Sequence, residues 1–201
     1  FRTGLTSMTS VSISYGNENL QTYFSYANTT GHGIIGKHNL SKHNLTFRET
    51  SVLLNSRLKL DGSMNLMRQV VKNKPTVGGF YMNPLVGLYR FPRGEDISYY
   101  KENFEVYDEG RNLNIQNWHT SYEDFEQNPY WITNRILSKE NRMHVIVSLS
   151  ANLKINDWLS LQTRGNVDYI NDKVRQQFYA STAPALAGAN GRYIEMNYQE
   201  T

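Results

Sequence analysis

The chain has 201 residues, with 21 basic and 18 acidic side chains and no cysteine. The charges are interspersed and nearly balanced, which gives no indication of a nucleic-acid partner, and the lack of cysteine excludes disulfides and thiolate metal sites in this sequence. No run of about 18 apolar residues is present, which excludes a transmembrane helix but not a transmembrane barrel of alternating strands. Because the sequence starts at Phe1, we expect a processed or internal piece of a longer chain.

Residues 10–26 form the first predicted hairpin. Apolar side chains alternate with polar ones, mostly serine, on both sides of a polar turn at residues 16–19. This period of two predicts strands with one dry and one wet face. The expected dry face carries Val11, Ile13, Tyr15, Leu20, Thr22, Phe24 and Tyr26.

Residues 28–43 are predicted to form a long connection. Residues 31–36 match G-x-G-x-x-G, but residues 37–46 lack the helical period that a dinucleotide site needs, so we interpret the segment as a flexible loop. His32, His38 and His43 fit neither one helix face nor one strand face. We interpret them as solvated loop histidines, and we expect no metal site and no cofactor.

A further hairpin is predicted from residues 44–54 and 58–68, with its turn near Asn55 and Ser56. Leu58, Leu60, Met64 and Leu66 share a face of the second strand. Which residues of the first strand lie on the dry face stays undecided, because Leu53 and Leu54 are both apolar and would point to opposite faces.

Residues 69–129 form the longest predicted connection. Thirteen of the 25 aromatic residues lie between residues 80 and 131. Aromatic rings beside polar groups suit contacts with sugars or peptides, although a long loop also needs a small core of its own, and we favour that role for most of them. The candidates for substrate contact are Tyr99, Tyr100, Trp118 and Tyr122.

Two acidic groups in this connection do not have the spacing of a calcium loop, and no catalytic nucleophile constellation is present. We interpret the acidic residues as a solvated loop surface and propose no catalytic residue. The two groups are Glu102, Glu105, Asp108 and Glu109, and Glu123, Asp124 and Glu126.

The clearest alternation lies in residues 142–155 and 158–169, which predict a hairpin of long strands. Only an odd-length turn keeps both dry faces on one side, so we expect Lys154 opposite Trp158 and Leu153 opposite Leu159. This register places His144 opposite Asp168. We expect that pair to face a lumen as a structural cross-strand contact, with a pH-sensitive or substrate-touching role as the alternative. Another long connection is expected beyond residue 170.

The predicted fold class is all-β, with antiparallel strands that form part of a transmembrane barrel. Tight turns near 16–19, 54–57 and 155–157 alternate with long connections, which is the layout of outer-membrane barrels. Tyr15, Tyr26, Trp158 and Tyr169 lie near strand ends, where an aromatic girdle is expected. Six strands cannot close a large barrel, so the segment needs further strands. A soluble β-sandwich remains the alternative.

An ordered set of short motifs across the chain resembles the SusC/RagA-like TonB-dependent transporters. The motifs are residues 1–4 (FRTG), 11–16 (VSISYG), 22–26 (TYFSY), 83–85 (NPL), 89–92 (YRFP), 128–131 (NPYW) and 155–161 (INDWLSL). One departure is Gly16-Asn17, where a Gly-Gly pair is frequent in that family. By this resemblance, residues 83–92 start a long extracellular excursion and residues 128–131 return from it.

The resemblance implies that residues 1–201 are an internal segment of a barrel of about 22 strands in the bacterial outer membrane, with residues 69–129 as an extracellular loop and a plug domain upstream. It implies outer-membrane lipid around the strands and import of oligosaccharides or peptides. The implied partners are a SusD-like surface lipoprotein and the TonB-ExbB-ExbD complex. The alternatives are a soluble or surface β-sandwich that binds carbohydrate or acts as an adhesin, and a barrel enzyme whose catalytic residues lie on strands outside this sequence.

Overall fold

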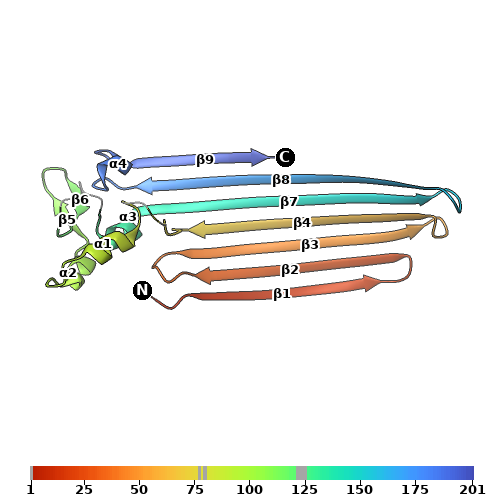
Figure 1. Ribbon diagram of the computed structural model, residues 1–201, viewed down its shortest axis with the longest axis horizontal. Helices are drawn as coiled ribbons and strands as arrows, with labels where there is room; N and C mark the ends of the chain where they lie inside the picture. Colours follow the sequence, from red (N-terminus) through yellow and green to blue (C-terminus); the bar gives the residue numbers. More distant parts are fainter. Residues whose placement is uncertain (1, 77, 79–80, 121–125) are drawn as a thin grey trace.

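The structure is a computed structural model that describes residues 2–76, 78, 81–120 and 126–201 (Figure 1). Most of the described chain is antiparallel β-structure, with a seven-stranded sheet and a separate two-stranded one. The strands are β1 (Leu5–Gly16), β2 (Leu20–His32), β3 (Asn39–Leu53), β4 (Leu58–Lys72), β5 (Glu105–Asp108), β6 (Leu113–Gln116), β7 (Ile136–Lys154), β8 (Ser160–Phe178) and β9 (Arg192–Glu200). The helices are α1 (Pro84–Arg90), α2 (Ile97–Glu102), α3 (Pro129–Arg135) and α4 (Pro184–Ala187).

The large sheet is a meander in the order β1-β2-β3-β4-β7-β8-β9. Each strand pairs with the next one in sequence, except that residues 73–135 are inserted between the paired strands β4 and β7. We call residues 73–135 the excursion. It contains α1, α2, α3 and the small β5–β6 sheet, and it lies at one end of the long strands (Figure 1).

The two ends of the sheet differ in their connections. Residues 17–19, 54–57 and 155–159 make short turns at one end, while the excursion and α4 lie at the other (Figure 1). The predicted long connection at 28–43 is wrong, because β2 and β3 extend until only residues 33–38 separate them. The expected loop beyond residue 170 is also wrong at its start, because β8 continues to Phe178 and β9 follows.

One face of the sheet carries five successive register rows of mainly apolar side chains on the half nearest the short turns. We call this the apolar band. Several of its side chains are largely exposed, among them Leu149 at 64%. The apolar members of the band are Val11, Ile13, Tyr15, Leu20, Phe24, Tyr26, Leu45, Phe47, Leu53, Leu58, Leu60, Met64, Leu66, Val145, Val147, Leu149, Ala151, Leu153, Leu161, Val167 and Tyr169. The same rows also contain Thr22, Glu49, Ser51, Gly62, Thr163 and Gly165. Leu53 pairs with Leu58 on this face and Leu54 enters the turn, which decides the facing that the sequence left open.

The opposite side of the same strands is polar, because successive residues of a strand point to opposite faces. We call it the polar face. Its members include Ser12, Ser14, Tyr23, Ser25, Thr46, Arg48, Thr50, Lys59, Asp61, Ser63, Asn65, Arg142, His144, Ser148, Ser150, Arg164, Asn166, Asp168 and Asp172. The predicted separation of a dry and a wet face therefore holds on β1 to β4, β7 and β8, in the half of the sheet nearest the short turns.

The register of β7 and β8 differs from the predicted one by two residues. Leu153 pairs with Leu161 rather than Leu159, and Lys154 pairs with Ser160 rather than Trp158. The physical reason is the turn, which has five residues because the Asn156 side chain accepts hydrogen bonds from the backbone N–H groups of residues 158 and 159. Five is still odd, so the predicted faces are kept while the predicted turn length is wrong.

A small core forms where the excursion meets the sheet. Ile132 of α3 and Ala187 of α4 pack with Ile136, Phe178 and Ile194. The last three residues belong to the strand positions that form the polar face. The helices α3 and α4 therefore cover the loop end of the polar face and do not contact the apolar band through this core.

Candidate functional site

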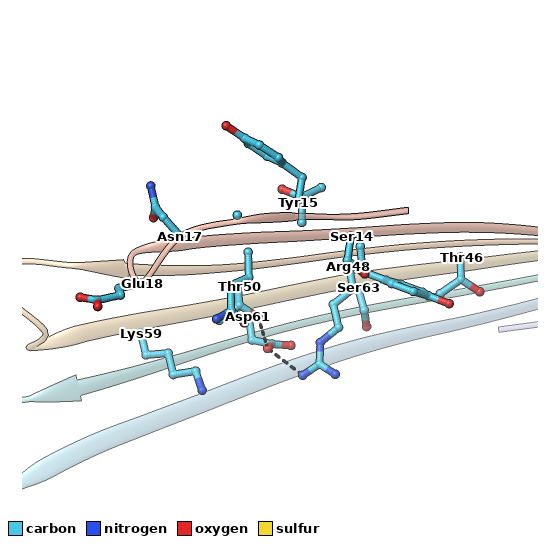
Figure 2. A pocket seen from close by; sticks show the side chains of 14 residues that line it. Ser14, Tyr15, Asn17, Glu18, Thr46, Arg48, Thr50, Lys59, Asp61 and Ser63 are labelled. Carbon is cyan, nitrogen blue, oxygen red and sulfur yellow. Dashed lines mark hydrogen bonds and ion pairs between the residues drawn. The ribbon is translucent and has the colours of Figure 1, made fainter. Parts of the chain in front are cut away.

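The polar face and the excursion above it form the candidate site, because charged and aromatic groups gather there. An open concavity of ≈ 1220 Å³ lies at the edge of the sheet near the short turns, lined by residues from β1 to β4. Figure 2 shows Arg48 and Asp61 on one side of the strands and Tyr15 pointing away on the other. The polar members are therefore separated from Tyr15, which belongs to the apolar band.

Arg48 and Asp61 make a cross-strand ion pair inside this concavity (Figure 2). Arg48 Nη2 donates to Asp61 Oδ2 over 2.9 Å, and Thr50 Oγ1 donates to the same oxygen over 2.8 Å. Asn65 Nδ2 donates to Thr46 Oγ1 further along the same strands. These bonds tie β3 to β4 by side chains as well as by the backbone ladder.

A second group of charges lies on β7 and β8. Arg142 makes two hydrogen bonds of 2.7 and 2.6 Å to the carboxylate of Asp172, its register partner. His144 pairs with Ile170 in the register, and yet its Nε2 lies 2.6 Å from Asp168 Oδ1. The predicted position of His144 opposite Asp168 is wrong, but the two side chains share a face and meet diagonally.

The predicted aromatic candidates lie in the excursion. Trp118 is buried, with 9% of its surface exposed, and packs against Phe91 and Tyr100 at centroid distances of 5.3 and 5.2 Å. Tyr99 is 54% exposed and lies edge-on to Tyr100 at 5.1 Å. Burial raises the pKa of the Tyr100 hydroxyl, and the nearby Glu95 raises it further. Tyr122 lies outside the described residues.

Trp118 and Trp131 belong to the internal packing of the excursion. Trp131 is 1% exposed and its Nε1 donates to Thr182 Oγ1, which follows β8. For these two rings, the contacts agree with the preferred interpretation of a small core within the segment. Among the named candidates, Tyr99 is the aromatic side chain that combines exposure with a place beside the ring cluster.

Glu126 contradicts the prediction of a solvated acidic loop. Only 3% of its surface is exposed, Trp118 Nε1 donates to its Oε1 over 3.1 Å, and Arg90 Nε lies 3.1 Å from its Oε2. His119 Nε2 approaches Oε1 to 2.9 Å without hydrogen-bond geometry. A buried carboxylate requires such partners, so Glu126 holds the aromatic cluster to α1.

Of the other acidic residues, Glu105 is also paired. Arg135 donates two hydrogen bonds of 2.7 and 2.6 Å to its carboxylate. This bidentate pair raises the pKa of the Arg135 guanidinium. Glu102 and Glu109 are exposed as expected, and Glu123 and Asp124 lie outside the described residues.

Sequence reasoning missed a buried amide network that holds the excursion together. The Asn128 side chain accepts from Tyr130 N–H and donates to the carbonyls of Tyr100 and Asn117, with no exposed surface. Gln116 Oε1 accepts from Asn128 N–H over 2.7 Å. The available signal was Asn-Pro at 128–129, because Asn at the N-cap and Pro in the first turn favour a helix start.

The three histidines of the G-x-G-x-x-G region lie on β2, on β3 and in the connection between them. His32 ends β2 and His43 lies within β3, so two of them are strand residues rather than loop residues. His43 Nδ1 bonds the Tyr26 hydroxyl at 2.7 Å, and His32 Nδ1 lies 2.6 Å from Asn39 Oδ1. No cluster of three metal-binding side chains occurs in the described part of the chain.

No helix within the described ranges combines the length and the apolarity that crossing a membrane requires. Comparison with models of known protein families and with curated proteins finds no match for this chain.

Proposed function

We propose that this chain forms part of the wall of an outer-membrane barrel that imports a large nutrient. The observation that carries the proposal is the apolar band, which is exposed to the surroundings across six neighbouring strands and faces away from an ion-paired polar side. Contiguous apolar patches of this extent are rare on soluble monomers. In a barrel, the apolar band would face lipid and the polar face would face the lumen, which explains why one side of the sheet is apolar and the other is polar.

The size of the band supports this proposal. From Leu153 to Val145 on β7, it covers about 27 Å along the strand, which is about 20 Å in height after the usual strand tilt and comparable with the ~25 Å band of outer-membrane barrels. The strands β7 and β8 have 19 residues each, well beyond the usual 5–6 of soluble domains. In a sandwich, a second layer would cover this face, and nothing in the described ranges does so.

The short-turn ends of the strands are staggered in one direction. β8 begins at Ser160, whereas the register aligns the first residue of β4 with Leu161 and that of β2 with Thr163. The strand starts therefore shift by three residues, about 10 Å, across the four strand spacings from β8 to β2, about 19 Å. This shift corresponds to a slope of roughly 30°. Tilted strands with staggered ends are the geometry that closes a sheet into a barrel.

The excursion supports a role in cargo contact. It packs on the loop end of the polar face, where it would stand over the mouth of a lumen. It presents Tyr99 beside a supported ring cluster, and flat aromatic rings suit stacking on sugars or peptide side chains. We therefore propose oligosaccharides or peptides as the cargo class.

The specific assignment to SusC/RagA-like TonB-dependent import rests on the motif resemblance. The motif at residues 83–85 begins α1, the motif at 128–131 begins α3, which leads back to β7, and the motif at 155–161 contains the β7–β8 turn. These positions suit an excursion that starts and returns as the resemblance implies. The SusD-like lipoprotein, the TonB-ExbB-ExbD complex and the outer-membrane location belong to this proposal. It assigns no catalytic step to the chain.

Cysteine labelling in membranes tests the proposal, since this chain contains no cysteine of its own. Single cysteines would replace Leu149 and Val167 in the apolar band, and Ser148 and Asn166 on the polar face as adjacent controls. In native outer membranes, a water-soluble maleimide is expected to label the polar-face positions and leave the band unlabelled, while a lipid-soluble maleimide labels the band.

Equal labelling of both faces by the water-soluble reagent would contradict the barrel wall. A native protein that stays monomeric in water without detergent would also contradict it and favour the sandwich alternative. Loss of glycan or peptide uptake after deletion of the gene, with uptake restored by the intact gene, tests the transport part separately.

A further inference from the structure

A cluster of basic residues lies on the same side of the sheet as the apolar band, at the end nearer the excursion. We call it the basic cluster. Its members are Arg68 and Lys72 of β4, Lys139 of β7, and Lys173 and Arg175 of β8. Each of them is an even number of residues away from a band residue on its own strand, so its side chain points to the same face of the sheet as the apolar band.

The register brings like charges together in this cluster. Lys72 pairs with Lys139, and Lys139 pairs with Arg175, so three cations stand in one row across three strands. Like charges opposite each other destabilise a sheet. The polar face differs, because there Arg48 and Arg142 each bond a carboxylate.

The seven-stranded sheet supplies one carboxylate on this part of the band side. Glu195 of β9 lies 2.6 Å from Lys173 Nζ and 3.2 Å from Arg175 Nε. Within the described ranges, Arg68, Lys72 and Lys139 make no ion pair, and all three are exposed. The cluster therefore keeps an excess of positive charge.

A polar atom without a partner lies within the cluster. Asn141 stands between Val70 and Lys173 in the register, in the row next to that of Lys72 and Lys139. Its Oδ1 is buried and lacks a hydrogen-bond partner among the described residues. Because this oxygen is closed to solvent, a ligand outside the sheet does not reach it, and only the basic side chains face such a ligand.

The position of the cluster limits the kind of ligand. Arg68 lies one row beyond the end of the band at Leu66, and Lys72 lies about 20 Å along the strand from Leu66. When the usual strand tilt is taken into account, Lys72 lies about 15 Å above the edge of the hydrocarbon layer. An ordinary headgroup layer is only about 5–8 Å thick, so a small phospholipid reaches the lower part of the cluster alone.

We propose that the basic cluster binds the phosphate groups of an anionic glycolipid whose bulky sugar headgroup stands against the outside of the wall. The proposal rests on the barrel wall proposed above, because that wall sets the cluster at headgroup level. Charge complementarity selects phosphate, and the height of the cluster selects a thick headgroup.

The test uses the native full-length protein in lipid nanodiscs and measures bound lipid by native mass spectrometry. The probes are an acylated disaccharide lipid carrying two phosphates, its dephosphorylated form, and an anionic phospholipid. The test variant carries Lys72→Gln, Lys139→Gln and Arg175→Gln. The control carries Lys59→Gln, Lys154→Gln and Arg164→Gln, which removes three cations from the polar-face side of the same three strands.

We expect the bisphosphorylated glycolipid to bind at least about 10-fold more weakly to the test variant and unchanged to the control, because each basic side chain near an anionic headgroup contributes measurably. Glu195→Gln removes the local carboxylate and is expected to strengthen binding, a change that misfolding cannot produce. The dephosphorylated lipid and the phospholipid are expected to bind weakly to every form.

Equal binding of the glycolipid to the test variant and the control would overturn the inference. Equal binding of the dephosphorylated lipid, or full competition by inorganic phosphate without acyl chains, would overturn it too. If the protein inserts in nanodiscs but binds the phosphorylated and dephosphorylated lipids equally, only the glycolipid site is refuted. A protein that stays soluble and does not enter nanodiscs refutes the barrel wall itself.

Discussion

His144 Nε2 lies 2.6 Å from Asp168 Oδ1, although the ladder places His144 opposite Ile170. The contact therefore runs diagonally between β7 and β8. Asp168 is 61% exposed, so water screens the pair. We expect Asp168→Ala to lower the free energy of unfolding by no more than about 1 kcal/mol. Urea unfolding in detergent measures it, with Asn166→Ala as the control on the same strand and face. A loss above about 2 kcal/mol would show that the pair does more than join two strands.

Val167 and Asn166 are neighbours on β8 that point to opposite faces. If the apolar band faces lipid, Val167→Arg should destabilise the protein folded in a bilayer by about 2–4 kcal/mol. Asn166→Arg on the polar face should change it by less than about 1 kcal/mol. Equal effects of the two substitutions would mean that both faces meet water.

Asn128 has no exposed surface and satisfies three backbone groups with one amide. Asn128→Ala should destabilise the excursion by about 2–4 kcal/mol, because buried carbonyls lose their donors. Asn83→Ala is the matched control. Asn83 also caps a helix that starts with Pro, and its loss should cost only about 1 kcal/mol. Limited proteolysis checks this, and cleavage that is no faster than in the control would contradict the role of the network.

Tyr99 is the exposed ring beside the aromatic cluster. Tyr99→Ala should weaken binding of the native cargo about 10-fold, which corresponds to about 1.4 kcal/mol. Tyr89→Ala, which removes a ring that is 82% exposed on α1, is the control and should leave binding unchanged. Isothermal titration with candidate oligosaccharides and peptides makes the comparison, and equal losses would show that neither ring is selective.

Glu195 lies outside the apolar band and carries a pKa lowered to about 2, first by the hydrogen bond from Lys173 and then by that from Tyr193. A carboxyl whose pKa is lower in the folded state stabilises the fold above its unfolded pKa near 4.5, and this stabilisation disappears as the pH falls towards 2. Lys173→Gln should raise the Glu195 pKa towards 4.5, and Arg175→Gln should raise it less. Carboxyl ¹³C NMR titration would contradict this order if Arg175→Gln gave the larger change.

The sequence was most informative where one physical pattern acts over many residues. Alternation predicted β1, β2 and β7 and the face on which each of their residues lies. The reason is that a register shift of one residue would move every apolar side chain to the opposite face. The β7–β8 register could not be predicted, since a three-residue and a five-residue turn keep the same faces and only the Asn156 hydrogen bonds choose between them. Periodicity also hid the ends of β2 and β8, because polar residues occur there on both faces and interrupt the alternation.

The excursion was the least predictable part. Its short helices lack a period that sequence can reveal, and its order depends on contacts between distant segments, such as Trp131 with Thr182 and Gln116 with Ser181. The burial of Glu126 was missed for the same reason, because its partners Arg90 and Trp118 come from separate elements. The Asn-Pro steps at 83–84 and 128–129 were the available local signals.

The chain leaves and rejoins the sheet at adjacent points. Asn73 N–H donates to Ser138 O over 2.8 Å, and Ser138 N–H donates to the Asn73 side chain over 3.0 Å. This pair of hydrogen bonds closes the base of the excursion and extends the pairing of β4 with β7 to the point where the chain leaves the sheet. The excursion can therefore gain, lose or exchange residues during evolution without a change in the strands below it. In such a design, related proteins could diverge in what they recognise while inheriting the same wall.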